Sequence, residues 1–503
     1  MIPIIFASSP VVKFILFFPF FVLFFLDYRV TLYYKRSFVN LVDSKRKKEF
    51  YNMSHSINQN ITPAALLKFA APSIVMMVFM SLYTIVDGIF VSRFLGSNAL
   101  SSLNIVYPVV SVAVALSTML GTGGSAIVSK YLGEGKNRRA REALTQFVVL
   151  ALLLSFILLI LSEMFLTPIS RFLGASDALL VDCRRYLGII MMFVPACMLQ
   201  SVFQSFLATA GYPGLGLVLM IAAGICNVAF DYVLIVPCQM GIAGAALATG
   251  IGQCIPAVCG LFFFLFTKQE LRFCHFTVSV KEILNACYNG SSEMVSQLSN
   301  AVITFLFNIV MMSLAGENGV AAITILLYGQ FLFNAVYMGF SIGISPIVGF
   351  QYGAGNKEKL RKIYRISFMF VMISSVLVVV VAVLFSPAIV TIFTKDQSTW
   401  DLAAVGFRIF AVNFLFSGIN VVSSGFFTAL SNGKVSALIS FSRTLGFIVV
   451  SLLTLPSIFG ITGAWLAVPV AEFMTMIFSG WMHRKYFWMH RKQNYLENSI
   501  SEN

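Results

Sequence analysis

The stretch SAIVSKYLGEGKNRRAR at residues 125–141 is matched 220 positions later by SPIVGFQYGAGNKEKLR at residues 345–361. Ser, Ile, Val, two Gly and an Arg coincide in the two stretches without a gap. GIAGAALA at 241–248 likewise shares six of eight residues with GITGAWLA at 460–467, and LGSNALSSL corresponds to AGENGVAAI. Three matches in the same order indicate that the chain consists of two halves with the same fold.

The composition excludes a soluble enzyme. Hydrophobic residues make up 58% of the 503 residues and charged residues only 11%, whereas soluble proteins carry about 25% charged residues. A helix that crosses a bilayer needs about 20 mainly apolar residues, so a chain of this length holds roughly a dozen such helices. We therefore expect an all-α, polytopic membrane protein.

Twelve apolar segments follow Met53, six in each half of the repeat. Because six spans return the chain to the side where it started, the two halves insert in the same orientation. We expect two six-helix bundles related by a pseudo-two-fold axis along the membrane normal, a parallel repeat of the kind that many transporters have. The segments are 66–92, 104–129, 143–166, 185–208, 216–237, 241–266, 283–314, 320–350, 366–393, 402–429, 435–458 and 461–482.

Single prolines lie inside several of these segments, at Pro72, Pro108, Pro195 and Pro346. In a membrane, neighbouring helices can satisfy the backbone groups that a proline frees. We therefore expect these prolines to bend the spans and not to end them.

The sequence also suggests domain boundaries. Residues 1–52 hold a Phe-rich apolar run and a basic linker, and we interpret them as a dispensable extension or as sequence upstream of a later start. A signal peptide and an additional span are the alternatives. We expect the first bundle at 53–267, a cytoplasmic loop at 268–282 and the second bundle at 283–483. A basic cytoplasmic tail is expected at 484–503.

The formal net charge of +14 points to membrane orientation and not to nucleic-acid binding, because the basic residues lie in short loops. The loops after spans 2, 6, 8 and 10, and the tail, are rich in Lys and Arg, including Lys136, Arg138, Arg139, Lys357 and Arg361. Cytoplasmic loops carry this excess in membrane proteins. We therefore expect both termini of the twelve-span unit in the cytoplasm.

Four carboxylates inside the expected spans are candidates for function: Asp87, Asp231, Glu293 and Glu472. A charge at the bilayer centre costs at least about 2.5–3.5 kcal/mol on insertion scales, so chains keep such residues mainly for function. The case is strongest for Asp87 and Asp231, which lie deep in spans 1 and 5. Glu472 has Arg484 or a neighbouring helix as a possible partner, and Arg443 is expected to extend to the membrane interface.

Polar side chains accompany the two deepest acids. Tyr83 precedes Asp87 by four residues and Asn227 precedes Asp231 by four, so each pair shares one face of its helix. Further polar residues of the same half are Gln200, Gln204 and Thr249. The position equivalent to Asp87 in the second half is Phe307. Such a one-sided cluster is typical of a single coupling-ion site.

Two carboxyl groups in one cavity suggest a mechanism. Burial away from water disfavours the charged form of a carboxyl group, so protons can load and leave such a site. An anionic cavity also attracts an organic cation. Competition between a proton and a cationic compound for the same charge is the simplest physical basis of antiport.

The chain resembles the multidrug and toxic compound extrusion (MATE) family and is similar to its bacterial, staphylococcal-type branch. The residues that carry the resemblance are Pro72, Tyr83, VDGIFVSRFLG at 86–96, NVAFD at 227–231, GIAGAALAT at 241–249 and the G-x-G loops after spans 2 and 8. The resemblance covers about residues 60–482. It implies a bacterial plasma-membrane protein that exports drugs.

The resemblance also implies roles for individual residues. Asp87, Asn227, Asp231 and Thr249, with Tyr83 nearby, would surround a proton or sodium site in the amino-terminal half. Pro72 would take part in bending of the first helix on protonation. Gln200, Gln204 and Glu293 are expected on the substrate side. Glu293 resembles an acid that another branch uses in span 7, but that branch's second acid near span 10 has no counterpart here, which disfavours sodium coupling of that type.

We thus expect a secondary active exporter that exchanges protons, or alternatively sodium, for hydrophobic cationic drugs. It should act as a monomer in the lipid bilayer, without a nucleic-acid partner. We expect no cofactor, because no CxxC, histidine cluster or GxxxxGK motif occurs. The alternative is a flippase for lipid-linked oligosaccharides, which the acidic intramembrane balance disfavours. A membrane-embedded prenyl transferase would need a DDxxD motif, which is absent, so we expect no enzyme.

Overall fold

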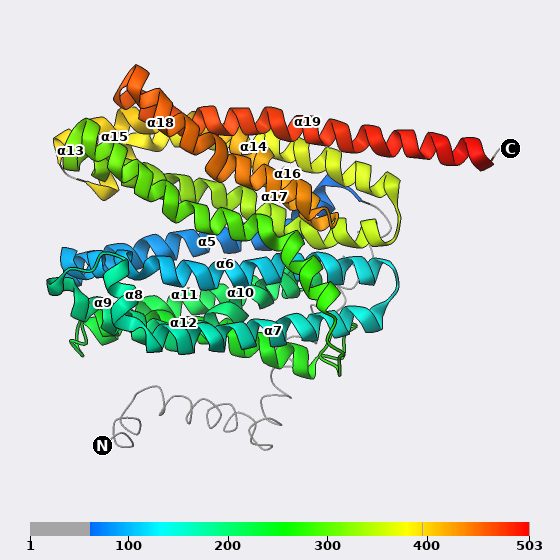
Figure 1. Cartoon of the computed structure of the whole chain (residues 1–503), viewed down its shortest axis with the longest axis horizontal. Coiled ribbons are helices and arrows are strands. Elements are labelled where there is room, and N and C mark those ends of the chain that lie inside the picture. Colours follow the sequence, from blue (N-terminus) through cyan, green and yellow to red (C-terminus); the bar gives the residue numbers. More distant parts are fainter. Residues whose placement is uncertain (1–60, 395, 502–503) are drawn as a thin grey trace, which may run out of the picture.

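The computed structural model describes residues 61–394 and 396–501, and every regular element in this part of the chain is helical (Figure 1). The expected extension at 1–52 lies outside the described residues. The N-terminal helices are α5 (Pro63–Leu95), α6 (Ser97–Gly133), α7 (Asn137–Met164), α8 (Leu166–Phe172), α9 (Asp177–Met192), α10 (Val194–Thr209), α11 (Pro213–Ile235) and α12 (Ile242–Phe266). The C-terminal helices are α13 (Val280–Gly353), α14 (Lys357–Phe393), α15 (Gln397–Phe410), η1 (Ala411–Asn413), α16 (Phe414–Ala429), α17 (Gly433–Phe441), η2 (Ser442–Gly446), α18 (Phe447–Phe459) and α19 (Ile461–Ser501).

The helices are long and apolar enough for a polytopic membrane protein, as the sequence predicts. Ten helical stretches of the described residues have the length and hydropathy of a membrane span, and the bent pair α9–α10 forms another. At about 1.5 Å per residue, the 74 residues of α13 are far too long for one crossing of a hydrocarbon core about 30 Å thick. Gly316 divides α13 into two helices, and the described residues thus contain the twelve expected spans.

Glycine 316 also shows that the sequence repeat is a structural repeat. Its φ of 61° lies in the left-handed region, and Gly96, 220 residues earlier, has a φ of 86°. Glycine has no Cβ and adopts this conformation without steric cost. Three further pairs of equivalent positions also have a positive φ in both halves: Gly135 and Gly355, Gly211 and Ser431, and Gly241 and Gly460. The two halves therefore turn at equivalent positions.

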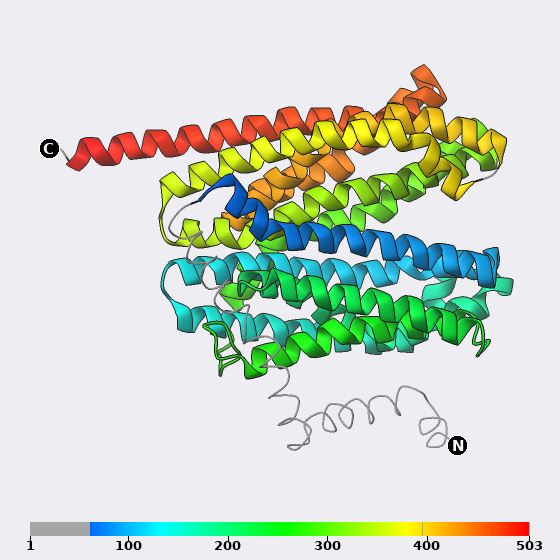
Figure 2. The same ribbon diagram turned by 180° about the vertical axis from the view of Figure 1, so that it is seen from behind.

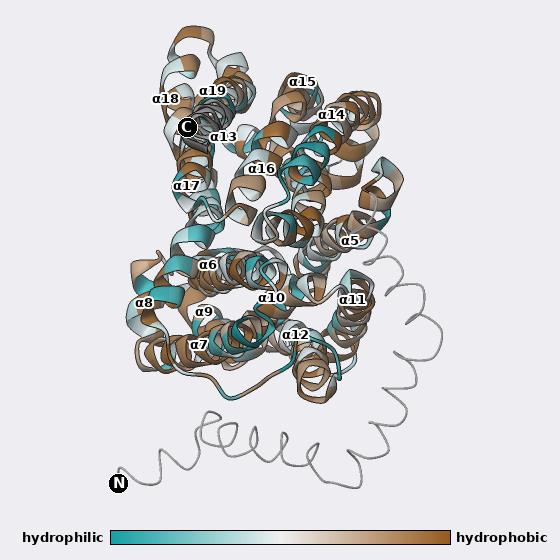
Figure 3. Cartoon of the chain, turned by 90° about the vertical axis from the view of Figure 1, so that its right-hand side faces the viewer, coloured by the Kyte–Doolittle hydropathy of each residue, from teal (hydrophilic) through white to brown (hydrophobic). Residues whose placement is uncertain are grey.

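The N-terminal and C-terminal helices lie on opposite sides of a central layer in which α5, α6 and α13 pack together (Figures 1 and 2). The loops between α6 and α7 and between α13 and α14 lie at one end of the bundle, which we call the basic end because Lys136, Arg138, Arg139, Lys357 and Arg361 are there. Figure 3 views this end, with hydrophilic residues in teal. Large apolar side chains such as Ile157, Leu377 and Val450 are exposed along the flanks, as contact with lipid requires.

Three of the four prolines leave their helices continuous. Pro72, Pro108 and Pro346 lie inside continuous helices, as expected. Span 4 is instead broken into α9 and α10, which meet at an angle of 52°. Pro195 stands in the first turn of α10, where its missing N–H leaves no hydrogen bond unmade.

Candidate functional site

Asp87 on α5 and Asp231 on α11 come together in the N-terminal helices. Their carboxyl groups are close enough for each to experience the charge of the other. Asp231 is only 1% exposed, and the only group that interacts with its oxygens as a hydrogen-bond partner would is the Asp87 carboxyl group; Oδ1 of Asp87 is likewise buried without another partner. Within residues 61–394 and 396–501, no ion pair involves either acid. Two buried carboxyl groups without a counter-cation can accept a proton or a cation at little cost to other contacts.

Three residues predicted around the acids have contacts in this region. Asn227 is one turn before Asp231, and its Nδ2 donates to Thr249 Oγ1 on α12 at 3.4 Å. Its own Oδ1 is buried without a partner. Tyr83 lies within range of the Asp87 charge. A Cβ on Gly224 of α11 would lie 3.5 Å from the Tyr83 ring, so α11 and α5 pack closely beside the acids.

Tyr186 on α9 also belongs to this site, although the sequence did not reveal it. Its buried phenol group experiences the charges of both Asp87 and Asp231. Tyr328 on α13 lies within range of Asp87 as well, and its hydroxyl is 3.9 Å from the position of a Cβ on Gly88. In a chain with 17 Tyr and 50 Phe, a single tyrosine does not stand out in the sequence as a site residue. Only tertiary packing identifies these two residues: α9 packs against α6 and α12, and α13 packs against α5.

Gln200 and Gln204 lie in a separate hollow between α10, α11 and α12. The Gln204 amide Nε2 is 3.5 Å from the sulfur atoms of both Met76 and Met77, and Gln200 Oε1 is buried without a partner. The hollow has a volume of about 10 Å³, enough for about one water molecule and far below the roughly 300 Å³ of a small drug site. The substrate role of these two residues stays a prediction.

The C-terminal helices hold a different charged centre. Arg443 in η2 donates from Nε to Glu472 Oε1 on α19 at 2.7 Å, and Asn420 Nδ2 on α16 donates to Glu472 Oε2 at 2.7 Å. The expectation that Arg443 extends to the interface is wrong: its side chain is 16% exposed and is held by the carboxylate of Glu472, which is 1% exposed. Between the two partners considered for Glu472, the neighbouring helix is correct. Glu293 on α13 faces the Arg443 charge, apart from the aspartate pair.

Glu163 in α7 is a fifth intramembrane acid that sequence analysis passed over. Its Oε1 atom is buried without a hydrogen-bond partner and lies 3.6 Å from the position of a Cβ on Gly188. It lies inside the expected span 143–166, three residues from its end, and is not among the four acids named from the sequence. Among the described residues, no hydrogen bond or ion pair connects it with Asp87 or Asp231.

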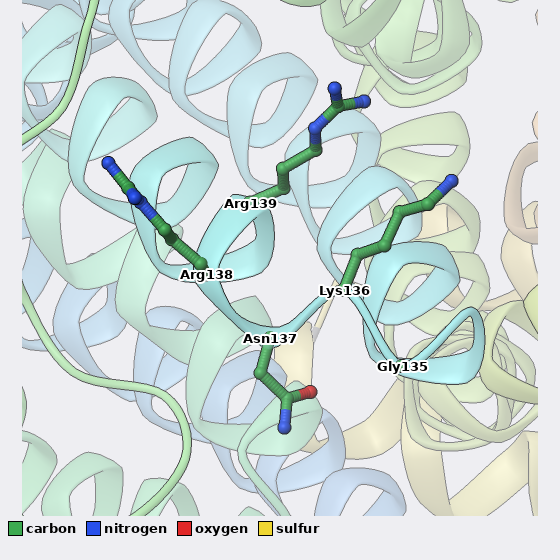
Figure 4. Close-up of a pocket in the computed structure, with 5 residues that line it drawn as sticks. All are labelled: Gly135, Lys136, Asn137, Arg138 and Arg139. Carbon is green, nitrogen blue, oxygen red and sulfur yellow. The ribbon is translucent and has the colours of Figure 1, made fainter.

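A hollow of about 510 Å³ at the basic end is unrelated to these acids (Figure 4). It is lined by Gly135, Lys136, Asn137, Arg138 and Arg139. Two of its three basic side chains already have partners, because Lys136 pairs with Glu134 at 2.6 Å and Arg138 with Glu142 at 2.9 Å. In the described part of the chain, no three His, Cys, Asp or Glu side chains gather as a metal site.

Comparison with known proteins agrees with this arrangement. The MatE family model matches residues 72–233 and 294–453, one segment in each half. The multidrug export protein MepA of Staphylococcus haemolyticus is 22% identical over 422 residues, which are 81% of this chain and 90% of that protein. MepA of Staphylococcus aureus is 22% identical over 424 residues, with the same coverage.

Solved structures with the same fold are MATE transporters. An outward-facing multidrug resistance MATE family transporter of the MOP superfamily superposes with a TM-score of 0.81 at 22% identity, covering 85% of this chain and 96% of that one. A Vibrio cholerae MATE transporter variant gives a TM-score of 0.79 at 19% identity, covering 84% and 96%. The all-helical, twelve-span fold predicted from the sequence is thus confirmed.

Proposed function

Because the chain belongs to the MatE family, we propose that it is a secondary active multidrug exporter that exchanges H⁺, or alternatively Na⁺, for hydrophobic cationic compounds. The N-terminal and C-terminal helices would rock against each other and expose a central path to one side of the membrane at a time. One chain contains both halves of the repeat, so we propose that a monomer suffices. The basic end would face the cytoplasm of a bacterial cell.

The observation that carries this proposal is the unpartnered pair Asp87 and Asp231. Both oxygens of Asp231 and one of Asp87 are buried with no hydrogen-bond partner apart from the other acid, a costly arrangement that proteins rarely keep for structure alone. Tyr83 and Tyr186 would tune the site because each lies within range of one or both acid charges. Asn227, one turn before Asp231, would do so together with Thr249, to which it donates a hydrogen bond. This supports coupling in the N-terminal helices.

The energetics of such exchange are sufficient for export. A proton that neutralises one carboxylate removes the attraction for a cationic drug, and the drug removes the attraction for a proton. A membrane potential of 100 mV contributes about 2.3 kcal/mol per net charge moved. Since about 1.4 kcal/mol corresponds to a tenfold concentration ratio, one net charge would support a substantial drug gradient.

Ethidium retention in efflux-deficient cells tests the proposal. Cells that express the chain should retain less ethidium than empty cells, and a proton uncoupler should abolish the difference. Asp87→Asn should abolish uncoupler-sensitive export at unchanged membrane abundance. Asp401→Asn is the matched control, because Asp401 is exposed and should export normally.

Proteoliposomes with separately imposed gradients distinguish the coupling ions. Export that follows a pH gradient at equal sodium supports H⁺, and export that follows a sodium gradient at equal pH supports Na⁺. Normal uncoupler-sensitive export by Asp87→Asn would refute the coupling role assigned to that residue. If neither a pH gradient nor a sodium gradient drives transport of a cationic compound, the proposed ion–drug exchange is refuted.

A further inference from the structure

Two glycines at equivalent positions of the repeat meet where α6 passes α13 at the basic end. A Cβ built on Gly133 would fall on the carbonyl oxygen of Phe350 and 2.9 Å from the backbone nitrogen of Ala354. A Cβ on Gly353 would fall on the carbonyl oxygen of Lys130. Gly133 and Gly353 are 220 residues apart, as are Lys130 and Phe350. The contact is therefore the same on both sides of the pseudo-two-fold axis.

A second pair of contacts flanks the first. A Cβ on Gly123 of α6 would overlap the carbonyl oxygen of Ala286 and lie 2.8 Å from the backbone nitrogen of Gly290, and a Cβ on Gly290 would overlap the carbonyl oxygen of Met119. The equivalent contact in the other half joins Gly343 of α13 to α5, where the Cβ would lie 2.8 Å from the Cα of Ala70.

These contacts join the N-terminal to the C-terminal helices through backbone and not through side chains. We call the set the glycine seam: Gly123, Gly133, Gly290, Gly339, Gly343 and Gly353. Gly339 belongs to it because its Cβ would lie 2.6 Å from the carbonyl oxygen of Ser73. Small residues allow helices in a membrane to approach this closely, whereas any larger residue would force the backbones apart.

The seam is confined to the half of the bundle near the basic end. On α5 toward the other end, a Cβ on Gly88 would meet only the Tyr328 hydroxyl across the interface, at an ordinary 3.9 Å. Gly329 contacts Phe407 within the C-terminal helices. Two polar contacts add to the closure at the basic end: Tyr131 donates to Glu282 Oε1 at 2.7 Å, and Lys130 Nζ lies over the Tyr352 ring.

We propose that the glycine seam is the inner gate of this transporter, the contact that closes the central path at the basic end. Packed backbones exclude water and cargo without needing a side chain to move. For the path to open at the basic end, the seam must separate, because the two sets of helices touch there most closely. The inference rests on the proposed alternating access. It adds that the two conformations differ at these six glycines.

Deuterium exchange measured by mass spectrometry on the purified full chain tests the gate without any drug or ion. Gly133→Ala and Gly353→Ala each insert a methyl group into the seam, and overpacking of this kind shifts a two-state equilibrium by about tenfold or more. We expect at least about tenfold faster exchange in peptides covering 117–135 and 340–356, with lower ethidium export in cells.

Gly480→Ala is the matched control, because a Cβ there meets nothing within 4 Å; both its exchange and its export should equal those of the original chain. Wild-type exchange in folded Gly133→Ala and Gly353→Ala would overturn the proposal. If neither variant yields monodisperse protein, Tyr131→Phe decides, because it removes one closing contact without adding atoms. Faster exchange of the same peptides in Tyr131→Phe supports the gate, and unchanged exchange overturns it.

A chain that exports nothing refutes the proposed function and leaves the exchange measurement valid. A chain that exports normally but shows no response of these peptides to seam substitutions refutes only the gate. The two failures are therefore distinguishable.

Discussion

The two halves of the molecule treat buried charge in opposite ways. In the N-terminal helices, Asp87 and Asp231 carry the same kind of charge, lie side by side and have no basic partner among the described residues. In the C-terminal helices, Glu472 accepts from Arg443 and from Asn420. The N-terminal acids thus have no basic side chain to neutralise them, whereas the C-terminal glutamate has both a counter-charge and a hydrogen-bond donor.

The repeat makes this difference more informative. Gln200 is equivalent to Asn420 at the offset of 220, and Gln253 is equivalent to Glu472 at the offset of 219. Both glutamines have a buried Oε1 without a partner, so the same positions hold neutral amides in one half and a charged network in the other. We infer that the C-terminal network fixes the packing of α16, α19 and η2, whereas the N-terminal acids are free to exchange ions.

The largest expected effect tests the N-terminal side of this comparison. Asp231→Asn should abolish uncoupler-sensitive ethidium export, because it removes one of the two exchangeable charges. Thermal unfolding in detergent should occur at the same or a higher temperature, since removing one of two neighbouring like charges relieves repulsion. A clear drop in unfolding temperature would mean that the acid pair is structural, and the contrast between the halves would fail.

On the C-terminal side, we expect substitution of Glu472 to lower stability. Glu472→Gln removes the carboxylate that pairs with the Arg443 guanidinium and should lower the free energy of unfolding by about 3 kcal/mol. This is the lower end for breaking a buried pair, because glutamine still accepts hydrogen bonds and Glu293 still faces the Arg443 charge. Chemical unfolding in detergent measures this value.

A double variant serves as the control for that measurement. Adding Arg443→Met to Glu472→Gln removes the unpaired charge and should restore most of the lost stability, since buried pairs are often replaceable by apolar residues. Wild-type stability in Glu472→Gln, combined with lost export, would instead assign the ion pair to transport.

The smallest effect concerns helix caps that differ between the halves. Asp396 Oδ2 accepts from the backbone nitrogen of Thr399 at 2.8 Å at the start of α15, whereas the equivalent Ser176 before α9 makes no such bond. The Thr399 hydrogen bonds hold the pKa of Asp396 below its usual value. A lowered pKa in the folded state means stabilisation that is present at neutral pH and lost as the pH falls through that pKa.

Asp396→Ala should therefore lower the unfolding temperature slightly at pH 7, and the difference should shrink on acidification below the ordinary aspartate range near about 3.9. Ser176→Ala should change little at either pH. A difference for Asp396→Ala that grows on acidification would contradict the assigned cap.

The sequence was sufficient for the fold because hydropathy and repetition are properties of the chain itself. Tyr83 with Asp87, and Asn227 with Asp231, could be placed on shared helix faces from spacing alone. Tyr186 could not be found in this way, since its place beside the acids depends on how α9 packs against α6 and α12. The pairing of Arg443 with Glu472 also depends on tertiary packing, because the two residues are 29 positions apart on different helices.

The contact between Gly133 and Gly353 has a consequence for the origin of the molecule. An interface in which each side makes the same contact as the other is the kind that two identical subunits form around a two-fold axis. A six-helix ancestor with this surface would have closed upon a second copy of itself as a homodimer. Fusion of the two genes would have released each copy from matching the other, so that one could keep bare acids while the other acquired a bound arginine.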